Sequence, residues 1–219
     1  MKEKNRRGQI DFENPELYMG EVEIGVSFTS FMTGVVFFFI GLLLTGDPSL
    51  QQFLRIPMLY LFMSAYGFLY STLVYANASG EVARLRRKSF DTQMKIGNIL
   101  SEYWGVYGLV FASPLVILGY SPDKLLALFV LGVSLLGFIL YHLSGFSILE
   151  RYFSRNVFLS IFSIMSLLHV GSFVSFYCVM EYHLKIMGAY YGFSILVGVG
   201  MIVIFLICMK REEKRRCGG

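Results

Sequence analysis

The segment YANASGEVARLRRKSF, residues 75–90, joins the end of an apolar run to a group of charged side chains. These charged residues, called the charge cluster below, are Glu81, Arg84, Arg86, Arg87 and Lys88. In membrane proteins, Lys and Arg gather in the cytoplasmic connections, whereas the spanning helices are apolar. The segment therefore raises two questions: whether the chain crosses a membrane, and which side of the membrane this stretch faces.

The composition is that of a membrane protein. Hydrophobic residues make up 55% of the 219, charged residues only 16%, and the mean hydropathy is +0.60, whereas soluble domains average about 25% charged residues. The three cysteines form no CxxC pair and no zinc-ligand spacing, so neither a structural metal nor a cofactor is predicted. Orientation in a membrane explains the net charge of +4, so no nucleic-acid partner is expected.

Six apolar stretches have the length that a helix needs to cross a bilayer, roughly 17 to 25 residues. They lie near residues 24–46, 57–78, 101–120, 125–143, 157–180 and 187–209. Short connections follow the first, third and fifth stretches, and Asp-Pro or Pro-Asp pairs mark turns in two of them. The sequence therefore predicts an all-α, polytopic membrane helical bundle of six spans, arranged as three antiparallel hairpins.

The basic residues predict that both termini are cytoplasmic. In that orientation all but three of the 19 Lys and Arg residues lie inside, the exceptions being Arg55, Lys124 and Lys185, as the positive-inside rule requires. The predicted organisation is a cytoplasmic tail over residues 1–23, a transmembrane domain over 24–209 with a basic loop near 79–100, and a basic cytoplasmic tail over 210–219. We expect a multi-pass protein of the cell membrane.

This orientation decides how the opening segment is interpreted. Asn77-Ala78-Ser79 matches the glycosylation pattern by chance, because glycosylation acts on the other face. Glu81 and Arg84 have the spacing of a helical ion pair, with a carboxylate at the mouth of a permeation path as the alternative. The basic side chains of the charge cluster are expected to contact anionic lipid headgroups. Residues 82–100 either extend the second span or lie on the interface.

His169 is the ionisable side chain nearest the middle of a predicted span. Serines recur at every third position around it, but at about 100° per residue the series winds around the helix. Only Ser163, Ser166 and His169 share an arc, of about 120°, and this arc is the predicted polar lining. For His169 itself, a neutral ring that bonds to neighbouring helices is the expected role, and a gating or proton-carrying role is the alternative.

The carboxylates avoid the middle of the predicted spans. We expect Glu81, Glu102 and Glu150 at the cytoplasmic border and Asp47, Asp123 and Glu181 at the external one. No nucleophile–base pair and no set of metal ligands can be assembled at one depth. The sequence therefore predicts a protein that is not an enzyme, and the rival hypothesis is an enzyme that acts on lipid headgroups through the three cytoplasmic glutamates.

Two further features concern packing. Gly188 and Gly192 form a GxxxG pattern in the sixth stretch, which lets helices approach closely within the chain or between two copies. Pro114 favours a kink in the third stretch. Together with the His169 arc, these features favour a small-solute permease or channel-like protein. The alternative is a non-catalytic accessory or scaffold subunit, whose partners would be the lipid bilayer, a second copy, or another membrane protein.

Overall fold

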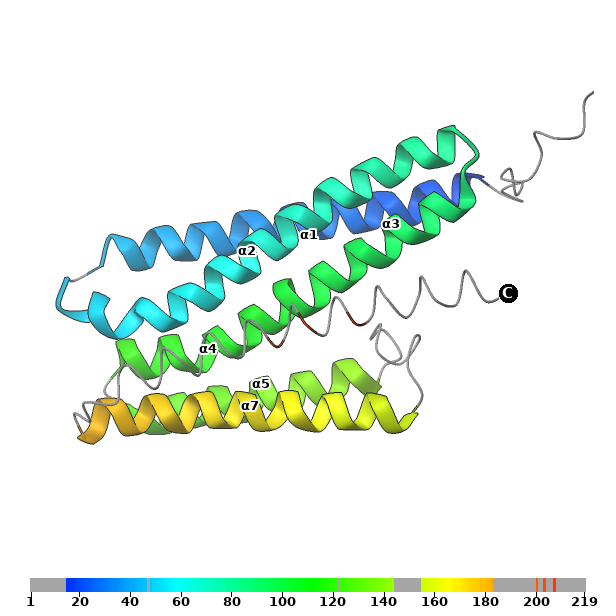
Figure 1. Ribbon diagram of the computed structural model, residues 1–219. Coiled ribbons are helices and arrows are strands. Elements are labelled where there is room, and N and C mark those ends of the chain that lie inside the picture. Colours follow the sequence, from blue (N-terminus) through cyan, green and yellow to red (C-terminus); the bar gives the residue numbers. More distant parts are fainter. Residues whose placement is uncertain are drawn as a thin grey trace, which may run out of the picture. The chain divides into compact units, whose positions relative to one another are not determined.

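The computed structural model describes residues 15–46, 48–121, 123–143 and 155–182, and the isolated positions 200, 203 and 207. All regular structure in these residues is helical (Figure 1). The elements are α1 (Pro15–Leu44), α2 (Pro48–Ala83), α3 (Arg87–Ile99), the π-helix η1 (Leu100–Val106), α4 (Tyr107–Tyr120), α5 (Lys124–Leu143) and α7 (Arg155–Tyr182). Of these, α3, η1 and α4 follow one another without a break.

Five helical stretches in the described residues are long and apolar enough to span a membrane. They are Pro15–Leu44, Leu54–Ala83, Arg87–Tyr120, Lys124–His142 and Leu159–Met180. The predicted all-helical class is thereby confirmed, and each of the first five predicted spans overlaps one of these helices. The sixth, residues 187–209 with Gly188 and Gly192, falls outside the described residues apart from three isolated positions, so six spans in three hairpins stays a prediction.

Two helices extend beyond the expected boundaries. α1 begins at Pro15, where the fixed φ of proline suits the first helical position and its missing N–H costs nothing. Residues 79–100, expected as a basic loop, are helical except for a short turn between α2 and α3. In this turn Leu85 has a φ of 54°, the left-handed conformation that lets the chain reverse. The region therefore extends the spans as helix.

Contacts divide the chain into two compact units. Unit 1 consists of Met1–Ile40 and Phe62–Tyr107, and unit 2 consists of Gly41–Leu61 and Gly108–Gly219. Unit 1 thus holds most of α1, the second half of α2, and α3 with η1. Unit 2 holds the first part of α2 together with α4, α5 and α7.

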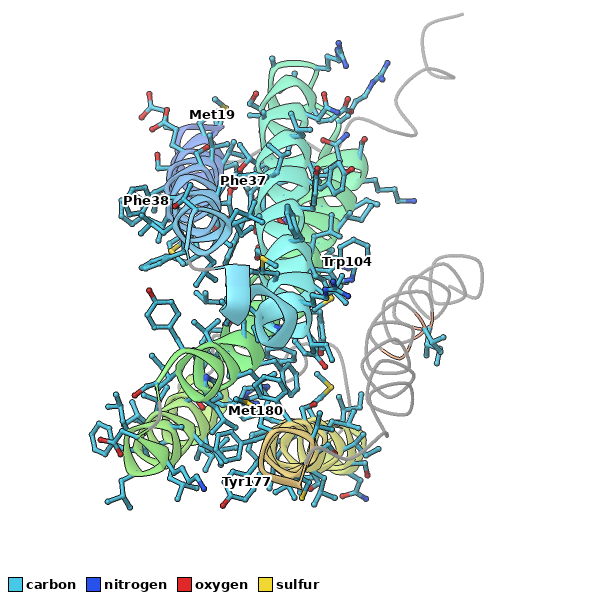
Figure 2. The ribbon with its side chains drawn as sticks, turned by 90° about the vertical axis from the view of Figure 1, so that its left-hand side faces the viewer. Met19, Phe37, Phe38, Trp104, Tyr177 and Met180 are labelled. Carbon is cyan, nitrogen blue, oxygen red and sulfur yellow. The ribbon has the colours of Figure 1, made fainter. Side chains whose placement is uncertain are left out.

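Unit 1 is a three-helix bundle in which α2 lies beside α1 and beside α3 with η1 (Figure 1). The Thr29 and Thr72 hydroxyls are 2.7 Å apart, and the rings of Phe37 and Tyr66 meet further along the pair. Positions on α1 rise as those on α2 fall, so these two helices are antiparallel. Figure 2 shows Phe38 on the side of α1 turned away from α2, where it is 64% exposed.

An apolar core closes unit 1 near the α2–α3 turn. Val22 of α1, Ala78 and Val82 of α2 and Phe90 of α3 are buried together. The ring of Tyr18 packs edge-on against Phe90 at 5.4 Å. All three helices contribute to this core, so the helical extensions beyond the predicted spans are packed parts of the bundle.

In unit 2, α5 and α7 form an antiparallel pair. The rings of Phe138 and Phe162 stack at 5.2 Å, and Lys124 lies over the ring of Tyr177 at the other end of the pair. Helix α4 also contacts α7, through Phe111 near one end and Gly119 near the other. Unit 2 therefore places side chains from α4 and α5 against one face of α7.

Candidate functional site

The helix that contains Glu102 is interrupted by the π-helix η1, which covers seven residues. Its backbone N–H groups reach carbonyls five residues back, as the bond from Tyr107 to the Glu102 carbonyl shows. Short π segments arise where a helix carries one extra residue, and they are frequent at functional sites. The irregular turn therefore makes η1 a candidate functional position in unit 1.

Two serines of α2 hold the π-turn. Ser71 Oγ donates to the Gly97 carbonyl at 2.7 Å, and Ser64 Oγ donates to the Gly105 carbonyl at 2.6 Å. The serines are seven residues apart and the carbonyls eight, because η1 fits an additional residue into the same length of helix. The spacing of the serines on α2 thus matches the π-turn and would not match a regular α-helix.

Glycines let α2 and η1 come close enough for these bonds. A Cβ on Gly67 would lie 2.5 Å from the Cβ of Trp104 and 2.6 Å from the Gly105 nitrogen. A Cβ on Gly105 would lie 2.5 Å from the ring of Phe68. Small residues at helix contacts allow such close approach in membranes. The backbone around Glu102 therefore packs closely against α2 and cannot move toward it.

Glu102 is buried in this region, with 1% of its surface exposed. Across from it on α2, the hydroxyl of Tyr75 donates to the side-chain oxygen of Asn98. The Ser101 hydroxyl donates to the backbone carbonyl of Asn98 at 3.0 Å. These four residues are called the Glu102 cluster: Glu102 and Tyr75 are buried, whereas Asn98 and Ser101 are half-buried.

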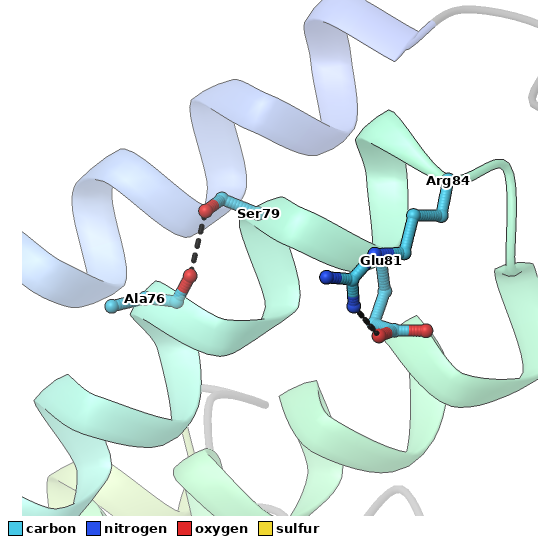
Figure 3. Close-up of polar contacts among 4 residues, drawn as sticks. All are labelled: Ala76, Ser79, Glu81 and Arg84. Atoms are coloured by element: carbon cyan, nitrogen blue, oxygen red, sulfur yellow. Dashed lines mark hydrogen bonds and ion pairs between the residues drawn. The ribbon is translucent and has the colours of Figure 1, made fainter.

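The charge cluster lies at the end of α2 and the start of α3. The expected ion pair is present, since Arg84 Nη1 donates to Glu81 Oε1 at 3.1 Å (Figure 3). The Arg84 side chain is 64% exposed, whereas that of Glu81 is 8% exposed. Arg86 and Lys88 are exposed, and Arg87 lies over the ring of Tyr18 at 5.8 Å. The turn therefore presents positive charge outward.

The sequon in the opening segment lies on helix α2 and not in a loop. Asn77 is exposed, and Ser79 Oγ donates to the Ala76 carbonyl at 2.6 Å (Figure 3). A hydroxyl that bonds within its own helix is part of the regular structure of that helix. The geometry fits the interpretation of this sequon as a chance match.

His169 is buried in unit 2, where Ser134 of α5 lies 2.9 Å from its Nε2. The Ser134 hydroxyl and Nε2 share a hydrogen bond, and the same hydroxyl reaches the Leu131 carbonyl at 2.9 Å. The ring packs edge-on against Phe111 at 4.8 Å. Nδ1 of His169 and Oγ of Ser172 are buried with no hydrogen-bond partner among the described residues.

The three residues of the predicted polar lining have different surroundings. His169 is buried, Ser166 is half-buried, and Ser163 is exposed. Ser163 lies beside Ile164 and Leu167, which are 53% and 72% exposed. The arc therefore runs from the inside of unit 2 to its outer surface, and only His169 belongs to an enclosed polar site.

Glu102 is the residue whose importance the sequence did not reveal. In the sequence it resembles Glu81 and Glu150, because all three lie near basic residues at the edge of an apolar stretch. The available signal was the series Gly97, Ser101 and Gly105, small residues four apart that favour close helix contact. That spacing predicts a packed face, but not that a carboxylate is enclosed by it. Glu150 lies outside the described residues.

No group of three His, Cys, Asp or Glu side chains within the described ranges is arranged to hold a metal ion. No family model matches the chain, and neither a curated protein nor a solved structure matches it. Glu102 on the π-turn and His169 beside Ser134 are two of the buried polar positions in the described part of the chain.

Proposed function

We propose that this chain is a multi-pass membrane protein of the small-solute permease or channel-like class, with Glu102 as the ionisable group of its path. The observation that supports this proposal is the burial of Glu102, which lies on the π-turn with 1% of its surface exposed. Ionisable residues in membrane-spanning helices are rare, and they usually face a bundle interior or a route for ions and solutes.

The depth of Glu102 supports a place at the inner mouth of such a route. In the orientation that the basic residues favour, Tyr120 lies at the external end of its helix. Glu102 precedes Tyr120 by 18 residues, or about 27 Å along a helix. The hydrocarbon core is about 30 Å thick. Glu102 would therefore lie near the cytoplasmic end of the core, enclosed by helices that continue beyond it.

The orientation itself has a direct test. Lys88→Cys and Asp123→Cys are each made in a background without the native cysteines. Lys88 lies at the start of the 34-residue stretch Arg87–Tyr120, and Asp123 lies just beyond its other end. We expect an impermeant thiol reagent added outside intact cells to label the Asp123 position alone. Labelling of both positions from one side would overturn the orientation and the depth assigned to Glu102.

Transport is tested by reconstitution into liposomes with a panel of neutral and cationic solutes. The native protein should admit at least one solute faster than empty liposomes do. Glu102→Gln should slow this uptake about tenfold or more, the range expected for loss of a group that acts directly on the solute or a coupled ion. Glu23→Gln is the matched control, because Glu23 is exposed on α1, and it should transport as the native chain does.

The rival functions give different outcomes in the same preparation. If the protein is an accessory subunit, every solute should enter the liposomes at the rate measured for empty liposomes. This result would overturn the permease proposal. An enzyme would turn over a lipid headgroup and lose that activity on Glu81→Gln. The pairing of Glu81 with Arg84 and the burial of Glu102 favour the permease over the enzyme.

A further inference from the structure

His169 and Ser172 of α7 are buried polar residues in unit 2 that lie about one helical turn apart. They are 3% and 0% exposed. Neither Nδ1 of His169 nor Oγ of Ser172 has a hydrogen-bond partner among the described residues. Residues three apart on a helix are neighbours, with Cβ atoms about 5 to 6 Å from each other. The two side chains therefore lie on the same side of α7.

Similar side chains elsewhere in unit 2 are satisfied within their own helix. Nδ1 of His142, another buried histidine, donates to a carbonyl four residues earlier at 2.8 Å. The hydroxyl of Ser134 reaches a carbonyl three residues earlier at 2.9 Å, a bond that serines in helices commonly make. His169 Nδ1 and Ser172 Oγ make no such bond in the described structure. Because buried polar groups are normally paired with protein or ordered water, these two atoms indicate a ligand.

The contacts of the His169 ring favour a neutral ligand over an ion. Nε2 shares its hydrogen bond with Ser134 of α5 at 2.9 Å, and the ring packs edge-on against Phe111 of α4 at 4.8 Å. A hydroxyl and an aromatic ring supply no counter-charge, which a buried ion requires. The ligand is therefore expected to be small, neutral and able to form hydrogen bonds.

Water meets these requirements whichever ring nitrogen carries the proton. An imidazole nitrogen is a donor or an acceptor according to the tautomer, and a hydroxyl is both. Buried waters form about three hydrogen bonds, usually to polar groups that otherwise lack partners. With about 2.8 Å to each atom, one water bridges two groups that are up to about 5.6 Å apart. This reach matches neighbours that are three residues apart on a helix.

We propose that Nδ1 of His169 and Oγ of Ser172 bind one ordered water molecule inside unit 2. The water extends the hydrogen bond between Ser134 and His169 into a chain that runs from α5 to Ser172 on α7. Both ring nitrogens of His169 then have polar partners. The proposal does not involve Glu102 and is independent of the permease function.

The first test is a crystal structure of the full-length native protein, grown from lipid, at a resolution that shows ordered water. We expect a spherical density peak about 2.6 to 3.2 Å from both His169 Nδ1 and Ser172 Oγ. The absence of this peak, or a protein group bonded to either atom in its place, would overturn the proposal. An elongated density would identify a different ligand and would also overturn it.

Thermal unfolding gives an independent test, because a bound water and an unpartnered hydroxyl predict different results for Ser172→Ala. If Ser172 binds water, alanine removes one of the ligands of that water. We then expect the Tm of the purified protein to fall by about 2 to 4 °C, the shift for one hydrogen bond in a chain of this size. If the hydroxyl has no partner, alanine removes only a buried polar group. An unchanged or raised Tm would therefore contradict the proposal.

Ser160→Ala is the matched control on the same helix. Ser160 is exposed, and its hydroxyl donates to the Asn156 carbonyl at 2.9 Å within α7. The Tm of this variant should stay close to that of the native protein. A fall in Ser172→Ala that is no larger than the fall in Ser160→Ala would count against a bound water.

Combining Ser172→Ala with His169→Phe tests whether the two residues hold the same water. Phenylalanine keeps an aromatic ring against Phe111 but removes both ring nitrogens. In this background we expect Ser172→Ala to lower Tm by about half as much or less, because the water has already lost its other ligand. An equal fall in both backgrounds would show that the residues do not share a ligand, and the proposal would be wrong.

Discussion

Two helix–helix contacts, called seams below, are built in different ways. One lies between α2 and η1 in unit 1, and the other lies between α5 and α7 in unit 2. Gly67 and Gly105 bring the first pair of backbones so close that serine hydroxyls reach across to carbonyls. In the second pair, Phe138 and Phe162 fill the gap between the helices. Gly132 and Gly137 of α5 have no neighbour within 4 Å of an added Cβ.

This difference matters because Glu102 lies on η1, at the seam that Gly67 and Gly105 bring close together. A close backbone contact cannot adjust by rotating a side chain, so it fixes the turn that carries Glu102. An aromatic contact fills space and can repack when one ring changes. The contrast suggests that unit 1 holds its site rigidly, whereas the α5–α7 pair depends on individual side chains such as His169.

The largest expected effect on stability is at Gly67, a glycine in close contact with a neighbouring helix, in contrast to glycines of α5 that have open space around them. Gly67→Ala would place a Cβ 2.5 Å from Trp104 Cβ and 2.6 Å from the backbone nitrogen of Gly105, which neither atom can avoid without moving the helix. We expect destabilisation of about 3 kcal/mol, at the upper end for overpacking. Thermal unfolding of the detergent-solubilised protein measures it.

Gly137→Ala is the matched control for this substitution. Its Cβ would meet nothing within 4 Å, and alanine is the better helix former, by about 1 kcal/mol in water. We expect unchanged or slightly raised stability. If the two variants melt at the same temperature, the distinction between the seams is wrong.

A smaller effect is expected at the polar contact of unit 2. Ser134→Ala removes the hydroxyl that hydrogen-bonds to His169 Nε2 and leaves this ring nitrogen buried without that partner. The cost should be about 1 to 2 kcal/mol, the range for an unsatisfied buried polar group. Thermal unfolding again provides the measure.

His169→Phe tests the same contact from the other side. With Ser134→Ala already present, replacing the ring should restore part of the lost stability, because no unsatisfied ring nitrogen remains. A double variant that is no more stable than Ser134→Ala alone would contradict this explanation of the loss.

The smallest expected effect is at a serine that holds the π-turn. Ser71→Ala removes one bond to the Gly97 carbonyl, and side-chain bonds between membrane helices average about 0.6 kcal/mol. Ser113→Ala is the control, because Ser113 bonds only within its own helix, to the Val110 carbonyl, in the described structure. If both variants lose the same stability, the bond across the seam has no special role.

The Ser71 variant also tests whether the contact between α2 and η1 matters for the proposed function. If α2 positions Glu102 through the π-turn, Ser71→Ala should slow solute uptake into liposomes although it lowers stability only slightly. The Ser113→Ala control should transport as the native chain does. A change of stability without a change of uptake would assign Ser71 a structural role only.

Much of the helical framework could be predicted from the sequence because it depends on local properties. The spans near residues 125–143 and 157–180 match α5 and α7 closely, since apolar length alone defines a membrane helix. The helical form of residues 79–100 was one of two predicted options. The burial of His169 was also expected, because an ionisable ring in an apolar span needs enclosure or a partner.

The candidate site could not be predicted in the same way. A π-turn differs from a regular helix by a single extra residue, and whether that residue is accommodated depends on the facing helix. Here the facing helix supplies Ser64 and Ser71 at the matching spacing. For the same reason the arc of Ser163, Ser166 and His169 could be placed on one side of a helix, but not on the inside or the outside of unit 2.

By itself, then, the sequence determined that the chain is helical, apolar enough for a membrane, and asymmetric in its basic residues, because each property is a sum over neighbouring residues. The tertiary structure decided which polar side chains are enclosed. Glu102 and Glu81 have similar surroundings in the sequence and both are buried, yet Glu102 lies on the π-turn, whereas Glu81 pairs with Arg84 near the end of α2. Enclosure depends on contacts between residues far apart in the chain, which a single sequence does not specify.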